Sequence, residues 1–303
     1  MVDKVPYDEF SMFHENAEEF GIPFKPPAVR RTAVDLGDGR SLSALVWGTA
    51  PPELVFLHGG AQNAHTWDTV MLALDRPAVA IDLPGHGHSD GGRSGYLNPE
   101  DNADDVALAI ETLAPDAAAV IGMSLGGITT IALADRHPGL VRKMVLVDVT
   151  PGVNREKASA ITAFINGPET FGDFDELLAR TIEFNPTRSV ASLRRGILHN
   201  AVQRDDGTWV WRWARHRASA PAAATSADPH DQFNPLWDAV SGVKVPLMLV
   251  RGMRPQSVVD DADEAELLRR QPSARIEHIE EAGHSVQGDT PVELAALIAD
   301  FVG

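Results

Sequence analysis

The sequence contains no cysteine among its 303 residues. Disulfide bonds are therefore excluded, and so are zinc sites that use thiolate ligands. Neither a redox compartment nor a metal can be argued from thiols in this chain. The composition is 44% hydrophobic, which is enough to bury a sizeable core without such cross-links.

Basic residues are scarce relative to acidic ones. The chain has 26 Lys and Arg against 43 Asp and Glu, a formal net charge of −17 at pH 7. This charge opposes binding to phosphate backbones and anionic lipids, so we expect neither nucleic acid nor a membrane as a partner. No apolar run reaches transmembrane length, and the N-terminus carries acids where a secretory signal has a basic start. We therefore expect a cytoplasmic protein.

Short apolar strands alternate with helical patterns along most of the chain. Residues 30–48 read as a hairpin that turns at Asp38 and Gly39. Six further strands, most of them β-branched, are expected at 53–59, 78–85, 117–124, 144–149, 246–252 and 274–280. Helices are expected at 98–114, 126–138, 261–271 and 290–302. This α/β alternation is typical of a mostly parallel sheet covered by helices on both faces.

The stretch from 151 to 242 interrupts the alternation. It contains helical patterns at 174–184 and 189–203 and lies between two expected strands of the sheet. We expect an inserted helical cap over 151–242. The remaining residues, 1–150 and 243–303, would then form the core domain.

The clearest chemical signal is a serine between glycines at the end of a buried strand. Residues 120–128 read VIGMSLGGI, in which Ser124 lies between Gly122 and Gly126. A glycine turn with an incidental serine would give the same pattern. Here the motif ends an apolar strand and opens a helix, the context in which a sharp turn exposes a serine as a nucleophile. We therefore predict Ser124 as the nucleophile, with the N–H of Leu125 placed to bind an oxyanion.

Two histidines are candidates for the general base. His284 follows the last expected strand, in EEAGHSVQGDTP, and we predict it as the base because it comes after the serine in the chain. A surface or structural histidine is the alternative interpretation. His58, in FLHGGAQ, is the weaker candidate. It leads into a glycine pair. The N–H of Gly60, or as second choice that of Ala61, is expected to supply the other half of an oxyanion hole.

These motifs together resemble the α/β-hydrolase superfamily, over nearly the whole chain outside the insertion. The ordered set is specific, although no single motif is. Its members are HGG at 58–60, DLPGHGHSD at 82–90, GMSLGG at 122–127, LVDVTP at 146–151 and AGHS at 282–285. The resemblance implies an eight-stranded, mostly parallel sheet, a cap inserted after the sixth strand, and a triad of serine, acid and histidine. Members that open epoxides or displace halide have an aspartate at the elbow, so Ser124 disfavours those two activities.

The acid of the triad is where this sequence departs from the commoner family pattern. The loop after the seventh strand usually carries the acid, but here it reads RGMRPQSVVDDADEAEL, with Ser257 in the expected slot. Asp260 and Asp261 follow at a helix start, where carboxylates also serve as caps. Some members carry the acid at the end of the sixth strand, where this chain has Asp148. We rank Asp148 first, Asp260 second and Asp261 third; the true acid must hydrogen-bond the ring of His284.

No cofactor or metal is expected for this chemistry. His86 and His88 in DLPGHGHSDGG have no neighbouring cluster that would complete a metal site. The same segment lacks the GxGxxG pattern of dinucleotide binding. The acidic run DDADE lacks the glycine and the terminal glutamate of a calcium loop.

The insertion carries the residues expected to contact substrate. Trp209, Trp211 and Trp213 alternate, so on a strand they share one face, which either packs the cap or lines an apolar pocket. The insertion is nearly neutral although the rest of the chain is acidic. Its arginines, Arg212 among them, therefore either offer a cation to an anionic substrate or, as is more common, form a solvated face. The other arginines of the insertion that could serve as this cation are Arg188, Arg194, Arg195, Arg215 and Arg217.

We predict that the protein hydrolyses a carboxylic ester through an acyl-enzyme. The basic cap residues favour a small monoester that bears an acid, similar to the substrates of the monoalkyl phthalate hydrolases of this superfamily. Two alternatives remain open: carbon–carbon bond hydrolysis of the meta-cleavage type, and a non-enzymatic ligand receptor on the same fold. The expected partner is a small-molecule ester, and the oligomeric state is left open.

Overall fold

The fold is described from a computed structural model, for residues 4–94, 98–153, 156–213 and 233–303. Its centre is an eight-stranded sheet with the order β1-β2-β4-β3-β5-β6-β10-β11. The strands are β1 (Val29–Asp35), β2 (Ser41–Trp47), β3 (Leu54–Leu57), β4 (Ala78–Ile81), β5 (Ala119–Met123), β6 (Met144–Val147), β10 (Leu247–Gly252) and β11 (Arg275–Ile279). β1 and β2 form the predicted hairpin, β2 is antiparallel to β4, and the remaining pairs are parallel. This is the mostly parallel, eight-stranded sheet that the sequence predicts.

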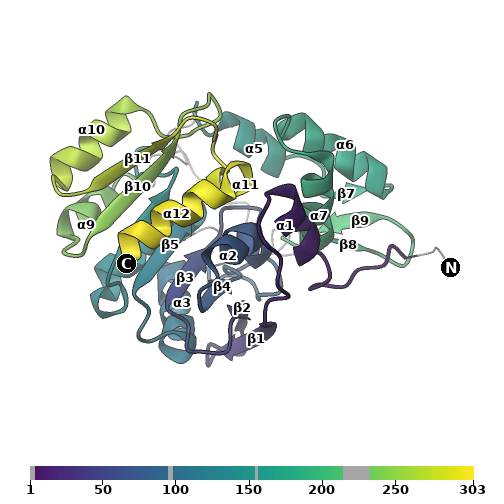
Figure 1. Cartoon of the computed structure of the whole chain (residues 1–303), viewed down its shortest axis with the longest axis horizontal. Helices are drawn as coiled ribbons and strands as arrows, with labels where there is room; N and C mark the ends of the chain where they lie inside the picture. Colours follow the sequence, from purple (N-terminus) through teal and green to yellow (C-terminus); the bar gives the residue numbers. More distant parts are fainter. Residues whose placement is uncertain (1–3, 95–97, 154–155, 214–232) are drawn as a thin grey trace.

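Helices cover both faces of the sheet (Figure 1). One face carries α3 (Pro99–Leu113), α4 (Leu125–Arg136) and α9 (Leu236–Gly242), and the other carries α2 (Asp68–Leu74) and α12 (Pro291–Val302). The remaining helices are α1 (Phe13–Glu19), α5 (Ser159–Ile165), α6 (Phe174–Phe184), α7 (Val190–Asn200), α10 (Asp261–Arg270) and α11 (Val286–Asp289), with short 3-10 helices η1 (Ala64–Trp67) and η2 (Pro138–Leu140). In the described part of the chain, no helix is both long enough and apolar enough to cross a membrane.

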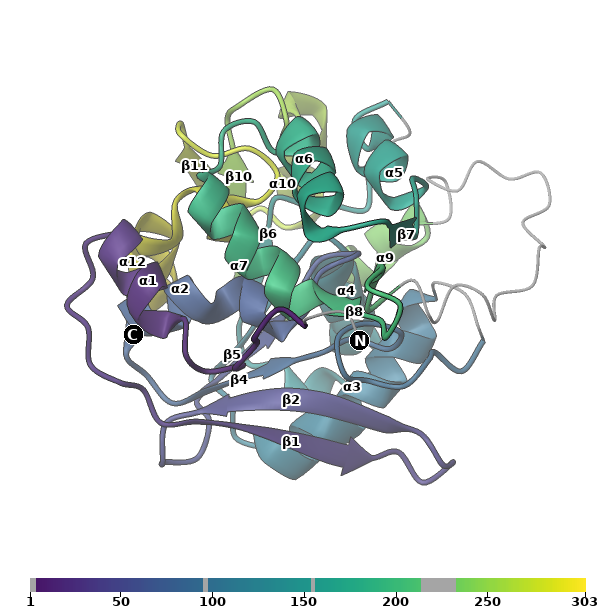
Figure 2. The same cartoon turned by 90° about the vertical axis from the view of Figure 1, so that its right-hand side faces the viewer.

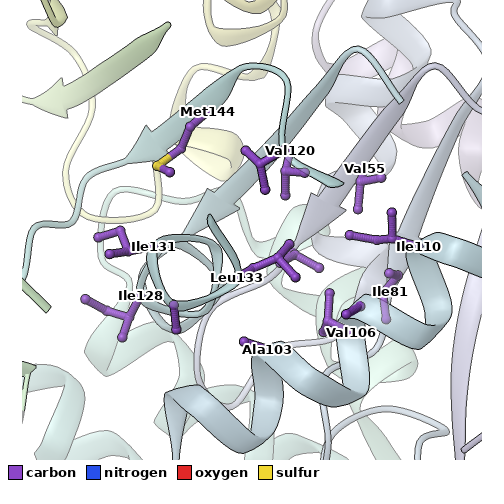
Figure 3. Packing of buried hydrophobic residues seen from close by; sticks show 14 of the residues in the cluster. Val55, Ile81, Ala103, Val106, Ile110, Val120, Ile128, Ile131, Leu133 and Met144 are labelled. Carbon is purple, nitrogen blue, oxygen red and sulfur yellow. The ribbon is translucent and has the colours of Figure 1, made fainter. Parts of the chain in front are cut away.

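Two hydrophobic cores lie on the two sides of the sheet. Successive residues of β3 alternate between them, with Val55 and Leu57 on one side and Leu54 and Phe56 on the other. This explains why the central strands lack polar alternation, since both faces are buried. Figure 3 shows the first core, where side chains of α3 and α4 pack against β3, β4, β5 and β6. Burial of each large aliphatic side chain stabilises the fold by about 1.5–3 kcal/mol.

The region between β6 and β10 holds more than helices. α5, α6 and α7 lie together in both views, away from β1 and β2 (Figures 1 and 2). Beside them is a three-stranded sheet of β7 (Thr170–Phe171), β9 (Trp209–Trp211) and β8 (Ala201–Gln203), which the sequence did not predict. The helix expected at 189–203 ends at Asn200, because the chain continues into β8. α9 packs in the first core against α4, so this part of the predicted insertion lies on the central sheet.

The turn between β5 and α4 is held together by glycines. Ser124 has the unusual backbone angles φ 50° and ψ −117°. A Cβ on Gly126 would lie 2.1 Å from the carbonyl oxygen of Leu57, and one on Gly122 would lie 2.4 Å from the carbonyl oxygen of Gly126. Both contacts are with backbone, which has little freedom to move away. These two positions therefore exclude any side chain, and the sharp turn at Ser124 depends on them.

Gly126→Ala is expected to destabilise the protein, although alanine normally favours a helix. The added methyl group would overlap the backbone of β3, and overpacking of this kind costs about 1–3 kcal/mol or more. We expect the thermal midpoint to fall by roughly 5 °C or more. Gly139→Ala is the matched control, because a Cβ there meets nothing within 4 Å. Equal midpoints for the two variants would show that the close approach at Gly126 is not required.

Candidate active site

A large cavity of about 890 Å³ lies beside the turn at Ser124. Its wall includes Gly60, Ser124, Trp211, Ser257 and His284. Ser124 follows β5 directly and His284 follows β11, so both lie beyond the carboxyl ends of parallel strands. In an open parallel sheet, this edge is where ligands bind. The cavity volume suits a small-molecule ligand.

His284 is hydrogen-bonded to a fully buried carboxylate. Its Nδ1 lies 2.9 Å from Oδ2 of Asp148, the residue that directly follows β6. That oxygen also accepts the N–H of Val258 at 3.1 Å. Oδ1 accepts the N–H of Gly252 at 3.0 Å and the hydroxyl of Ser257 at 2.6 Å. Ser257, which occupies the usual family position of the acid, therefore binds the carboxylate that contacts the histidine.

The other two candidate acids have different partners. The side chain of Asp260 accepts two N–H groups in the first turn of α10, and it lies 2.5 Å from Nζ of Lys157. Asp261 pairs with Arg251 at 2.8 Å, and its side chain is 97% exposed. Among the described residues, neither carboxylate hydrogen-bonds His284. Asp260 therefore caps a helix, and Asp261 forms a surface ion pair.

The predicted oxyanion donors differ in their availability. The N–H of Ala61 donates to Nε2 of His86 at 3.1 Å, so it already has an acceptor. Within the described part of the chain, no hydrogen bond uses the N–H of Gly60 or of Leu125. Leu125 directly follows Ser124 at the start of α4, and Gly60 lies in the wall of the cavity that Ser124 also lines. Of the three predicted oxyanion donors, the N–H groups of Gly60 and Leu125 are therefore the two without an acceptor in the described structure.

His58 has a structural environment. Its side chain is completely buried, its Nδ1 donates to the carbonyl of Gly59 at 2.8 Å, and its Nε2 accepts the N–H of Leu83 at 2.9 Å. Burial lowers the pKa of His58, which keeps the ring neutral. The histidine therefore fixes the glycine loop of the cavity against the segment after β4.

Of the four cap residues predicted to contact substrate, only Trp211 lines the cavity, and all four lie in the described part of the chain. Trp211 stacks on Trp213 with ring centroids 6.1 Å apart. Trp209 packs edge-on against Phe174. The guanidinium of Arg212 donates to the carbonyl of His199 at 3.0 Å. The tryptophan face therefore serves mainly to pack the small sheet, with one ring at the cavity.

The arginines of the insertion also have different surroundings. Arg188 and Arg195 both line the cavity, whereas Arg194 is exposed on α7. Arg195 is buried and bonds to acidic and amide side chains of α1, a helix that the sequence analysis did not predict. Arg215 and Arg217 lie outside the described residues.

Among the described residues, one cluster brings metal-ligating side chains together. It comprises His65, Asp68 and His199, whose ligand atoms lie within 4.8 Å of one another. The two imidazole rings stack with centroids 3.7 Å apart and an interplanar angle of 11°. Nitrogen lone pairs lie in the ring plane, so parallel rings direct them side by side and not onto one ion. As arranged, the cluster suits an ion-pair network better than a metal.

His65 is held between two carboxylates. Its Nδ1 lies 2.8 Å from Asp68 and its Nε2 lies 3.0 Å from Glu9, a residue of the N-terminal segment. Burial disfavours the protonated ring, but the two carboxylates outweigh it and raise the pKa of His65 to about 9. His65 and Arg31 in turn outweigh burial at Glu9 and lower its pKa to about 2. The spacing of His65 and Asp68, three residues apart, is the signal in the sequence that could have indicated this pair.

Comparison with known proteins shows the family of this chain. The sequence model of the alpha/beta hydrolase family matches residues 54–297. Esterase Rv0045c of Mycobacterium tuberculosis is 44% identical over 298 residues, which cover 96% of this chain and 94% of that protein. Its solved structure superposes with a TM-score of 0.83, at 43% identity, over 98% of this chain and 99% of that one.

The chain belongs to the alpha/beta hydrolase family. The predicted fold is confirmed. The near full-length similarity to an esterase also confirms the predicted enzyme class, a carboxylic ester hydrolase. A second relative is 2-(acetamidomethylene)succinate hydrolase of Mesorhizobium japonicum, 30% identical over 83% of this chain and 88% of that protein. A solved structure of such a hydrolase has a TM-score of 0.76, at 26% identity, over 91% of this chain and 99% of that one.

The network around His65 predicts a pH-dependent stability of this esterase. Because its folded pKa of about 9 exceeds the ordinary 6.5, protonation of His65 stabilises the fold fully below pH 6.5. The contribution is lost as the pH rises through about 9. Glu9→Gln removes one of the two carboxylates that raise this pKa. We expect it to lower the thermal midpoint more at pH 6 than at pH 9.5, by roughly 3 °C for each pKa unit of His65 that is lost.

Glu18→Gln is the matched control, since Glu18 is exposed and contacts neither His65 nor Arg31 in the described structure. Glu9 also pairs with Arg31, which stays charged, so part of the loss persists at high pH. A Glu9→Gln deficit of the same size at both pH values would show that His65 is not protonated in the fold.

Proposed function

We propose that Ser124 is the nucleophile of this esterase, His284 its general base and Asp148 the acid that orients the base. The bond of 2.9 Å between His284 and the buried Asp148 is the observation that carries the proposal. With Nδ1 bonded to the carboxylate, Nε2 is the nitrogen left to accept the serine proton. Ser124 and His284 line the same cavity, so an ester bound there can reach both.

In this scheme, the hydroxyl of Ser124 attacks the ester carbonyl carbon while His284 takes its proton. The N–H groups of Gly60 and Leu125 stabilise the negative charge on the carbonyl oxygen. The intermediate then expels the alcohol, which receives the proton from His284. Water, activated by the same histidine, attacks the acyl-enzyme and releases the acid. These steps require no cofactor.

We further propose that the substrate is a small monoester that carries a free carboxylate, similar to those of monoalkyl phthalate hydrolases. Two arginines of the insertion, Arg188 and Arg195, line the cavity in a protein whose formal charge is −17. One relative, by its name, hydrolyses a substituted succinate, which is a dicarboxylate. The insertion predicted over 151–242 would act as the cap, since Trp211 and several of its helical residues reach the cavity wall.

Ser124→Ala is expected to abolish hydrolysis of p-nitrophenyl butyrate, with a fall in kcat of at least about 10³-fold, because the variant has no nucleophile. Thermal unfolding of the variant serves as the control for an intact fold. If the folded variant kept wild-type activity, the proposed mechanism would be wrong.

Asp148→Asn is expected to lower kcat by about 10³- to 10⁴-fold, because the amide no longer fixes the Nδ1–H form of His284. Each oxygen of Asp148 accepts two hydrogen bonds. In the asparagine variant, an NH₂ group replaces one of these oxygens and therefore faces donors that it cannot accept from. Asp260→Asn is the comparison variant and is expected to change kcat by less than about threefold, since Asp260 caps a helix. The reverse ranking would assign the acid to the loop after β10.

A further inference from the structure

Three lysine and arginine side chains line the cavity within the described residues: Lys157, Arg188 and Arg195. Two of them are already neutralised by acids. Lys157 lies 2.5 Å from Asp260 and 2.7 Å from Asp263. Arg195 forms ion pairs with acidic residues of α1 and donates to the amide oxygen of Asn16. Neither cation needs a ligand to balance its charge.

Arg188 differs from the other two. Its Nη2 donates to the hydroxyl of Ser192 at 2.5 Å, which uses one of the five N–H donors of a guanidinium. The acids that act on its charge are Asp289 and Glu19, and neither forms an ion pair with Arg188 in the described structure. Asp289 accepts the N–H of Gly283, and Glu19 pairs with Arg195. Arg188 is therefore a cation without an ion-pair partner among the described residues.

Arg188 is also half-buried at the cavity wall. Burial lowers its pKa, and the distant acids do not compensate fully. An arginine stays protonated in proteins, so the charge persists in this environment. A half-buried charge with no ion-pair partner has lost part of its hydration, and a carboxylate that entered the cavity would offset that loss.

The position of Arg188 connects it to the reaction centre. A Cβ placed on Gly288 would lie 2.0 Å from Nη1 of Arg188, so the guanidinium rests against the backbone of α11. α11 begins two residues after His284, the proposed base. The missing side chain at Gly288 makes the room that the guanidinium occupies. One cavity thus contains Ser124, His284 and the cation.

We propose that Arg188 binds the free carboxylate of a dicarboxylic acid monoester while the ester group lies at Ser124. This inference rests on the proposed function and specifies its substrate class. The free carboxylate belongs to the acyl part of the substrate. It therefore stays bound to Arg188 in the acyl-enzyme after the neutral alcohol has left. A planar, two-pronged contact between guanidinium and carboxylate orients the acyl chain as well as attracting it.

The test compares two chromogenic esters of similar acyl length, mono-p-nitrophenyl glutarate, which carries a carboxylate, and p-nitrophenyl valerate, which does not. The quantity measured is the ratio of their kcat/KM values, acid over neutral. We expect Arg188→Met to lower this ratio by about 10- to 100-fold, the range for loss of a charge-assisted contact. Arg188→Lys keeps the charge but not the planar pair, so its ratio should fall between those of Met and wild type.

Arg194→Met is the matched control, because Arg194 lies on α7 outside the cavity and is exposed. Its ratio should equal that of the wild type. Free glutarate provides a second measurement: it should inhibit hydrolysis of the neutral ester competitively, with a Ki about 10-fold or more higher in Arg188→Met. Thermal unfolding of each variant identifies any loss of fold.

A ratio that is unchanged in a folded Arg188→Met protein, with unchanged inhibition by glutarate, would overturn the assignment. Equal losses with both esters would also overturn it, because they would indicate a structural role for Arg188. The proposed catalytic residues are tested separately, since Ser124→Ala should abolish turnover of both esters whatever Arg188 binds.

Discussion

The site is organised around one buried carboxylate that has four hydrogen-bond donors. Asp148 is fully buried and accepts bonds from Gly252, Ser257, Val258 and His284. A buried carboxylate is tolerated when its oxygens are fully hydrogen-bonded, and here the donors come from β10, the loop before α10, and the loop after β11. The same contacts that stabilise the charge therefore join three segments of the chain. They also fix the ring of His284 relative to the sheet.

Among the described lysine and arginine side chains at the cavity wall, two form ion pairs with acids and one does not. The chain is strongly acidic, and its acids neutralise Lys157 and Arg195 at the cavity wall. The acids around Arg195 belong to α1, so the N-terminal segment contributes to the wall although it lies far from the insertion in sequence. Arg188 has hydroxyl and backbone neighbours instead. The selectivity that we propose arises from this difference between neighbouring cations.

Much of the fold could be predicted because its signals are local. The buried strands are short apolar runs, and the serine motif requires glycines at fixed positions, so both can be recognised without knowing what packs against them. The strands β7, β8 and β9 were missed because two or three residues are too few to show a period. The network of Glu9, His65 and His199 was missed because its members come from three distant segments.

The sequence by itself determined where the strands of the central sheet lie along the chain. It also determined the sharp turn and the serine at its apex, because all of these depend on neighbouring residues. It left three carboxylates as candidates for the acid, since spacing along the chain does not show which one reaches a given ring. Only the tertiary structure decided that contact, which joins Asp148 and His284 across 136 positions. It also decided which of the two arginines in the cavity wall has no ion-pair partner among the described residues, because such ion pairs form between segments that are brought together only by folding.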